Sequence, residues 1–326
     1  MAALSASETR VLATSAEKKY EKKYDFNYFL KSAVSGGLCC AITHGSLTPL
    51  DVVKTRIQLD PTFNKGLIGG FKHIVAAEGM GGLFTGLGPT VVGYGIQGWF
   101  KFGGVEFFKI QFATTLGDQR TWENQTAIYL ASAAMAEFIA DIFLCPLEAT
   151  RIRLVSQPSY APGLVSGASR LLAEEGLLRG FYSGFGPILL KQVPYTMAKF
   201  SVQGEAEVRI AGSMGKTVGE LQGATKLAVA TGSGVIAGVA AGIVSHPADT
   251  LLSKVNKAGA GGTGSIMTRL GRIAAEIGFV KLCTVGLGAR CVMVGTLTAA
   301  QFLLFDVMMD ITGAEKFHFR PPAEVH

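Results

Sequence analysis

The sequence predicts an all-α membrane protein of six spans in three tandem repeats, and three observations support this fold class. The chain of 326 residues is 48% hydrophobic and only 17% charged, against roughly 25% charged residues in soluble domains. Six segments are long and apolar enough to span a bilayer, which takes about 20 residues. The same motifs also recur at a fixed interval along the chain, as in other repeat architectures.

The predicted spans alternate with shorter amphipathic stretches. Spans 79–100 and 227–248 contain no charged residue, whereas spans 29–48, 127–146, 181–200 and 291–306 hold a few isolated charges. Between paired spans, apolar residues at helical spacing predict helices in the plane of the interface. These stretches cover residues 66–78, 163–175 and 265–276. Buried helices of a soluble protein are the alternative, and six such segments in one chain argue against it.

The repeat is marked by four landmarks that stay in register. Pro49-Leu-Asp51 recurs at Pro146 and Pro247, at intervals of 97 and 101 residues. Three further landmarks begin at Glu78, Gly88 and Lys101 in the first copy. These landmarks predict a polar N-terminal segment (1–26), repeats at 27–115, 124–212 and 224–312, and a C-terminal tail (313–326).

Composition and motif spacing exclude several other classes. The net charge of +6 is small and the lysines are scattered, so no nucleic-acid-binding surface is expected. Anionic lipid or an anionic solute is the better partner for this charge. The five cysteines form no CxxC pair and the five histidines have no metal-ligand spacing. No phosphate-binding loop of a nucleotide enzyme is present. We therefore expect that the protein binds no metal and no cofactor and is not an enzyme.

The motif Pro-x-acid-x-x-base at the end of each odd-numbered span resembles that of the mitochondrial carrier family. The first two repeats carry it fully, and the third has Leu252 in place of the base, with Lys254 two positions later. The resemblance covers residues 27 to 312. The residues around these motifs, including Ala136-Glu137 and Lys191-Gln192-Val-Pro-Tyr195, are closest to the family's phosphate carriers.

This resemblance implies a multi-pass protein of the mitochondrial inner membrane, with the amphipathic helices on the matrix side. It implies a secondary transporter that moves inorganic phosphate into the matrix with a proton, or in exchange for hydroxide, by alternating access. The bilayer is then a partner, with cardiolipin as a candidate lipid. A carrier of another small anion (dicarboxylate or sulfate), a non-transporting scaffold of the same fold and a passive pore are the alternatives.

Two gates are expected from the same resemblance. Proline inside a helix removes a hydrogen bond and kinks it, which predicts kinks at Pro49, Pro146 and Pro247. At the matrix gate, Asp51 should pair with Arg151 and Asp249 with Lys54. Glu148 has no standard partner, because Leu252 is apolar, and Lys254 is the candidate in its place. At the cytoplasmic gate, Glu106, Lys109 and Asp306 keep part of the family pattern, and the middle repeat has lost it around Gln203-Gly204-Glu205. We expect this second gate to be weaker and asymmetric.

Ionisable residues at membrane depth are costly unless they are paired or face water, and they mark candidate sites. Glu137 and Asp141 share one face of the third span and, with His44, are the candidates for proton coupling; a core histidine held by hydrogen bonds is the alternative for His44. A small anion needs fixed cations and hydroxyl or amide donors. The expected substrate-binding residues are Lys191, Gln192, Arg290, Gln97, Tyr94 and Thr43.

Overall fold

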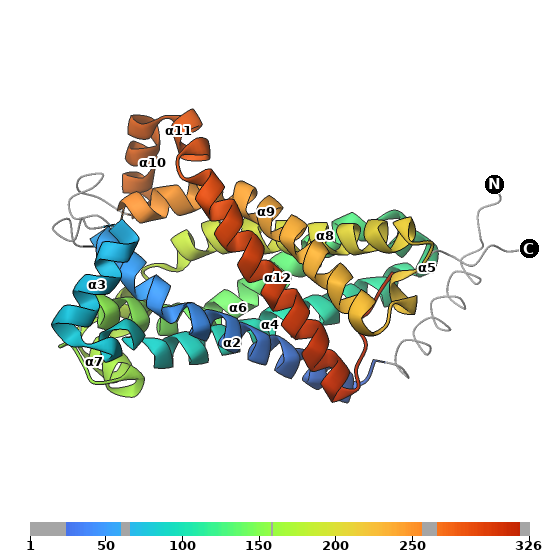
Figure 1. Ribbon diagram of the computed structural model, residues 1–326, viewed down its shortest axis with the longest axis horizontal. Helices are drawn as coiled ribbons and strands as arrows, with labels where there is room; N and C mark the ends of the chain where they lie inside the picture. The colour runs from blue at the N-terminus through green and yellow to red at the C-terminus, as the bar shows by residue number, and fades with distance from the viewer. Residues whose placement is uncertain (1–23, 60–65, 158, 256–265, 320–326) are drawn as a thin grey trace, which may run out of the picture.

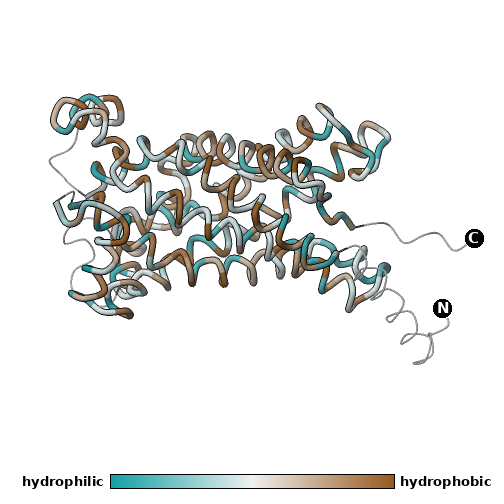
Figure 2. The backbone as a smooth tube through the Cα atoms, turned by 90° about the horizontal axis from the view of Figure 1, so that it is seen from below, coloured by the Kyte–Doolittle hydropathy of each residue, from teal (hydrophilic) through white to brown (hydrophobic). Residues whose placement is uncertain are grey.

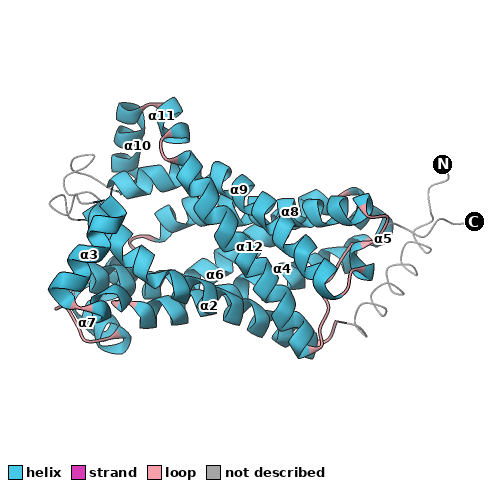
Figure 3. Cartoon of the chain, viewed as in Figure 1, coloured by secondary structure: helices cyan, strands magenta, loops and turns pink. Residues whose placement is uncertain are grey.

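The computed structural model describes residues 24–59, 66–157, 159–255 and 266–319. Throughout these segments the regular elements are helices and no strand is present (Figure 3). The predicted all-α fold class is therefore confirmed. The six long helices are α2 (Phe26–Leu59), α4 (Leu87–Leu116), α6 (Gln125–Ser156), α8 (Phe185–Ser213), α9 (Gly223–Val255) and α12 (Leu287–Thr312).

The long helices form a closed ring. Each packs against the next in the order α2, α4, α6, α8, α9 and α12, and α12 returns to α2 (Figure 1). One end of the ring carries α3 (Gly66–Glu78), α7 (Leu164–Gly176), α10 (Ile266–Ile277) and α11 (Phe279–Thr284). We call it the amphipathic end. The opposite end carries α5 (Asp118–Glu123), the start of α2 and the segment after α12, and we call it the terminal end.

The turns that end the amphipathic helices explain one of the sequence landmarks. Gly79, Gly176 and Gly278 have φ of +74°, +77° and +80°, a left-handed conformation that glycine adopts without a steric cost. After Gly79 the chain forms a short turn, η1 (Met80–Phe84), before α4 begins. The predicted span 79–100 is therefore wrong in its bounds: its first residues form this turn, and the helix continues to Leu116.

Polarity is arranged as expected for a bundle in lipid. Large hydrophobic side chains on the outside of the ring are exposed, among them Phe138 (48%) and Ile243 (50%), and hydrophobic residues occur along the full length of the long helices (Figure 2). Charged side chains are buried inside, such as Lys199 at 0% exposure. By length and composition, Gln125–Ser156, Gly223–Leu252 and Phe279–Thr312 suffice to cross a membrane.

Prolines lie within the odd-numbered spans as predicted, at Pro49 in α2, Pro146 in α6 and Pro247 in α9. Each helix is continuous through its proline. The predicted kinks remain predictions.

Small residues bring α2 and α4 into close contact, as is common between membrane helices. A Cβ atom at Gly98 would lie 2.3 Å from the carbonyl oxygen of Gly36 and 2.6 Å from Cβ of Cys40. Only glycine fits at this position without moving a helix.

We expect Gly98→Ala to lower the midpoint of thermal unfolding in detergent by several degrees, because overpacking of this kind costs about 1–3 kcal/mol. Gly88→Ala is the matched control on the same helix, since nothing lies within 4 Å of an added Cβ there. The control should leave the midpoint unchanged or raise it slightly, because alanine favours helix over glycine. Equal midpoints for the two variants would show that α2 and α4 are not this close.

Candidate functional site

A buried polar group lies inside the ring, where side chains of α4 and α8 reach α6. Its centre is Glu137 on α6, which has no exposed surface. The Glu137 carboxylate forms an ion pair with Nζ of Lys101 at 3.0 Å. Its Oε1 accepts a hydrogen bond from Gln97 at 2.8 Å, and its Oε2 accepts one from the Thr196 hydroxyl at 2.8 Å. Two neighbouring helices thus hold one carboxylate in place.

A second acid lies one turn further along α6. Asp141 is fully buried, and its Oδ1 lies 3.5 Å from Nε2 of Gln97. Its Oδ2 has no hydrogen-bond partner among the residues that the structure describes. We call Gln97, Lys101, Glu137, Asp141 and Thr196 the central cluster. It brings two carboxyl groups to a single ammonium, and an unbalanced buried charge is costly.

A hydrogen-bonded chain runs from α8 through α12 to α2. Lys199 donates to Oε1 of Gln301 at 2.5 Å. The amide nitrogen of Gln301 lies 3.2 Å from Nε2 of His44 and 3.4 Å from the hydroxyl of Thr43. The His44 ring stacks on Tyr94, with ring centroids 3.8 Å apart. The structure therefore places these three expected site residues, Thr43, His44 and Tyr94, beside one another.

Three phenylalanines close the axis on the terminal side of these groups. Phe102, Phe200 and Phe302 occupy the same position in the three repeats, and we call them the phenylalanine triad. Their ring centroids are 5.0, 5.5 and 5.8 Å apart, and the rings are buried. Because each ring contacts both others, the triad fills the space between α4, α8 and α12 at this level of the described structure.

Nearer the amphipathic end, one predicted ion pair is present. Arg151 lies 3.3 Å from Asp51, as expected, and also pairs with Glu148 of its own helix at 2.9 Å. Glu148 therefore has a partner that the sequence pattern did not indicate.

The second predicted pair at this end is wrong for this state of the molecule. Asp249 pairs with Lys191 at 2.9 Å and with Arg290, and among the described side chains Lys54 forms no ion pair with it. The reason is geometric: α9 lies between α8 and α12, so cations on those two helices reach Asp249 first. Arg290 is further fixed by Ser245, whose Oγ accepts a hydrogen bond at 2.9 Å.

The expected substrate-binding residues divide into two groups. Gln97, Tyr94 and Thr43 lie at or beside the central cluster, whereas Lys191 and Arg290 hold Asp249. Gln192 is half-buried next to Lys191 on α8. The Lys191 side chain is 38% exposed, so a solute can reach this cation.

Lys254 lies in α9, but its side chain is outside the described part of the structure. Its register position is that of Arg56 and Arg153, which pair with Glu78 and Glu175 of the amphipathic helices. Arg56 holds the pKa of the Glu78 carboxyl below its usual range through a hydrogen bond. The expected contact of Lys254 with Glu148 therefore stays a prediction.

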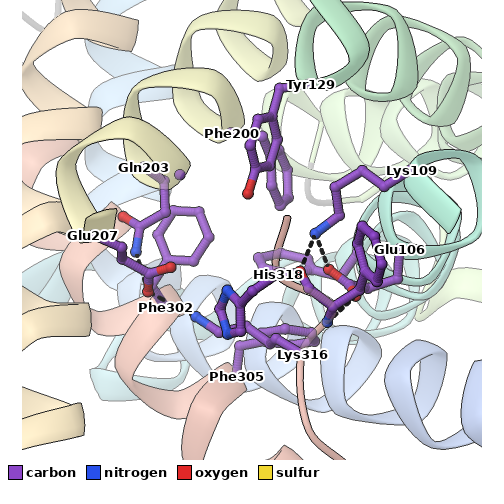
Figure 4. A pocket seen from close by; sticks show the side chains of 13 residues that line it. Glu106, Lys109, Tyr129, Phe200, Gln203, Glu207, Phe302, Phe305, Lys316 and His318 are labelled. Atoms are coloured by element: carbon purple, nitrogen blue, oxygen red, sulfur yellow. Dashed lines mark hydrogen bonds and ion pairs between the residues drawn. The ribbon is translucent and has the colours of Figure 1, made fainter. Parts of the chain in front are cut away.

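At the terminal end, the expected gate residues Glu106, Lys109 and Asp306 are all buried, and Figure 4 shows the first two beside the pocket there. Glu106 pairs with Lys109 at 2.5 Å. The middle repeat also contributes an acid here. This acid is Glu207, which stands at the repeat position of the base Lys109 and not at that of the acid Glu106. Glu205, in the stretch where the pattern was expected to be lost, instead pairs with Arg209 at the surface.

Sequence reasoning left several of these residues without a site role. Lys101, Lys199 and Gln301 share one repeat position, and this alignment marks them as facing residues without assigning Lys199 or Gln301 to the site. Thr196 aligns with Gly98 and Thr298, and Glu207 with Lys109 and Met309, so neither position keeps one residue type in all three repeats. Lys316, which pairs with Glu207 and Asp306, lies outside the three predicted repeats and gave no signal.

A closed ring of six long helices in three repeats, apolar outside and polar along its axis, defines a carrier-type membrane transporter. The sequence model of the family described as "Mitochondrial carrier protein" matches residues 26–115, 123–210 and 224–316. The chain belongs to the mitochondrial carrier family. It is a transporter and not an enzyme, and a multi-pass protein of the mitochondrial inner membrane, as predicted.

Named relatives match almost the whole chain. It is 46% identical over 294 residues to "Mitochondrial substrate carrier family protein N" of Dictyostelium discoideum, covering 88% of this chain and 97% of that protein. It is 40% identical over 299 residues to the "Probable mitochondrial phosphate carrier protein" of Schizosaccharomyces pombe, covering 91% and 95%. It is 38% identical over 312 residues to "Solute carrier family 25 member 3" of Homo sapiens, covering 95% and 82%. The predicted resemblance to the family and to its phosphate carriers is confirmed.

Proposed function

We propose that this protein carries inorganic phosphate into the mitochondrial matrix together with a proton, or in exchange for hydroxide, by alternating access. The choice of phosphate is supported by relatives that are named phosphate carriers, one of them 40% identical over most of both chains. The coupling to a proton is supported by the central cluster, where one buried ammonium serves two buried carboxyl groups.

The solute site in this proposal lies between the central cluster and Asp249. Lys191 and Arg290 hold the Asp249 carboxylate from two sides. An oxyanion presents the same kind of acceptor atoms as a carboxylate, and an arginine fork binds either with two hydrogen bonds. Phosphate would therefore compete with Asp249 for these two cations. Release of Asp249 would free it to pair with Lys54, its expected partner when the matrix gate is closed.

The central cluster supplies the coupling. A proton bound by Glu137 or Asp141 removes the negative charge that Lys101 does not balance, so the loaded pathway is closer to neutral. Gln97 contacts both carboxyl groups and keeps them next to each other. His44 is a second proton acceptor in this proposal, connected to Lys199 through Gln301.

The described state is closed at the terminal end by the phenylalanine triad, and at the amphipathic end one expected matrix-gate pair, Asp51–Arg151, is formed. The Asp51 side chain is 29% exposed in its pair with Arg151, and partly exposed pairs contribute about 0.2–1 kcal/mol each. Such weak pairs suit a gate that must form and break in every cycle. The solute then shifts the balance between the two states by binding one better than the other.

The substrate is tested by uptake of radiolabelled phosphate into liposomes that contain the purified protein. We expect uptake that saturates with phosphate and that is inhibited by unlabelled phosphate more strongly than by sulfate or malate. Preferred uptake of sulfate or malate would show a carrier of another anion, and a rate that does not saturate would show a passive pore. No uptake of any of the three by folded protein would show a scaffold.

A further inference from the structure

The chain continues past the last long helix and turns back between the helix ends. α12 ends at Thr312, and Gly313 has a φ of +66°, which allows the reversal. We call residues 314–319 the C-terminal segment. Within it Ala314 and Phe317 are buried, at 7% and 3% exposure. The segment thus lies among the gate residues of the terminal end instead of extending away from them (Figure 4).

The backbone of the segment is held by the acid–base pair of α4. The N–H of Phe317 donates to Oε2 of Glu106 at 2.9 Å, and its carbonyl oxygen accepts from Nζ of Lys109 at 3.2 Å. The Tyr28 hydroxyl donates to the same Glu106 oxygen at 2.8 Å. Glu106 and Lys109, the expected gate pair of repeat 1, therefore bind the segment as well as each other.

Lys316 supplies a cation that two other repeats lack. The repeat position of Lys109 holds Glu207 in repeat 2 and Met309 in repeat 3. Nζ of Lys316 lies 2.7 Å from Glu207 on α8 and 2.9 Å from Asp306 on α12. Asp306 is 1% exposed, and Lys316 is its one ion-pair partner within the described residues. Without the segment, the buried charged residues here would be three acids, Glu106, Glu207 and Asp306, and one base, Lys109.

Aromatic contacts complete the closure. The Phe319 ring packs edge-on against Tyr129 of α6 with centroids 5.0 Å apart, and Phe317 packs against Tyr24 at 5.6 Å. Between the segment and the helix ends remains a cavity of about 20 Å³, room for one water molecule. The match to the family sequence model ends at residue 316, so the contacts of Phe317 and Phe319 lie beyond it.

We propose that the C-terminal segment is a working part of the terminal-end gate, in which Lys316 joins α8 to α12 while the end is closed and the segment withdraws each time it opens. This inference rests on the alternating access proposed above, but it does not depend on which solute is carried. A solute cannot pass from the terminal end to the phenylalanine triad while the segment lies among Glu106, Glu207 and Asp306.

The test measures access to the pathway without any solute. Cys40 lies beside the polar chain, with its Sγ 3.7 Å from the Gln301 amide. Liposomes are selected for an outward terminal end with an N-terminal affinity tag and treated with a membrane-impermeant maleimide. Mass spectrometry then follows modification of the peptide that contains Cys39 and Cys40. We expect Lys316→Met, and truncation after Gly313, to speed this modification at least fivefold.

Matched variants distinguish the gate from general effects. Lys226→Met removes a half-buried lysine that pairs with Asp310 near the same end, and Glu315→Gln changes an exposed residue of the segment itself. Both should behave like the wild type. Cys145 is buried beside Phe181 toward the opposite end and reports loss of packing. Modification of Cys40 at the wild-type rate in both test variants would overturn the proposal. So would an equal rise at Cys145, because it would show that the segment only stabilises the fold.

Discussion

Glu137→Gln is expected to reduce uptake of phosphate driven by a pH gradient by at least 100-fold. Glutamine has nearly the same shape, but it is neutral, so it cannot form an ion pair with Lys101 or take up and release a proton. The substitution also leaves Lys101 buried without its carboxylate, and breaking a buried pair costs about 3–5 kcal/mol. Initial rates per folded protein, in liposomes with an alkaline interior, measure the effect.

A double variant separates coupling from stability in this experiment. Lys101→Met with Glu137→Gln removes both charges, so the thermal midpoint should recover toward the wild-type value. Gradient-driven uptake should stay low, because the carboxyl group is still missing. Glu123→Gln, an exposed acid on α5, is the control and should transport normally. Recovery of gradient-driven uptake in the double variant would show that Glu137 does not carry the proton.

Arg290→Gln is the second variant with a large expected effect. The Arg290 guanidinium contacts Asp249 and Ser245 and is 9% exposed, so glutamine removes both a charge and a fork of donors. We expect the concentration of phosphate at half-maximal rate to rise at least tenfold, together with a lower maximal rate. Arg290→Lys keeps the charge and should recover part of the loss.

Arg209→Gln provides the matched control for Arg290. The Arg209 side chain is 82% exposed and pairs with Glu205 on the outside of α8, so its loss should leave the transport kinetics unchanged. An unchanged half-maximal concentration in Arg290→Gln would mean that phosphate does not use this cation, and the solute site would have to lie at the central cluster alone.

Much of the fold could be predicted from the sequence because the repeat landmarks have local physical causes. The Glu-Gly landmark marks a turn in which glycine takes a positive φ, and the amphipathic stretch 66–78 matches α3 residue for residue. The start of the second span could not be predicted as well. Residues 79–86 are as apolar as the helix that follows, so hydropathy does not distinguish the η1 turn from the start of α4.

The site was less predictable because its pairs join different helices. The pairing of Asp51 with Arg151 was implied by the family resemblance, and the structure shows that contact. The partners of Asp249 could not be predicted, because both Lys191 and Arg290 come from even-numbered spans whose rotation about their axes is set by packing. Lys316 had no counterpart in any repeat, so nothing local linked it to Glu207.

Proton-coupled phosphate transport is tested most directly by separating the two driving forces in liposomes. The external pH is held constant, so that the charge state of external phosphate does not change. The internal pH is varied while potassium and valinomycin clamp the membrane potential, and then the potential is varied at equal pH. Our account predicts uptake that rises with an alkaline interior and does not respond to the potential, because a singly charged phosphate and a proton cross together without net charge. Uptake that follows the potential and ignores the internal pH would contradict it.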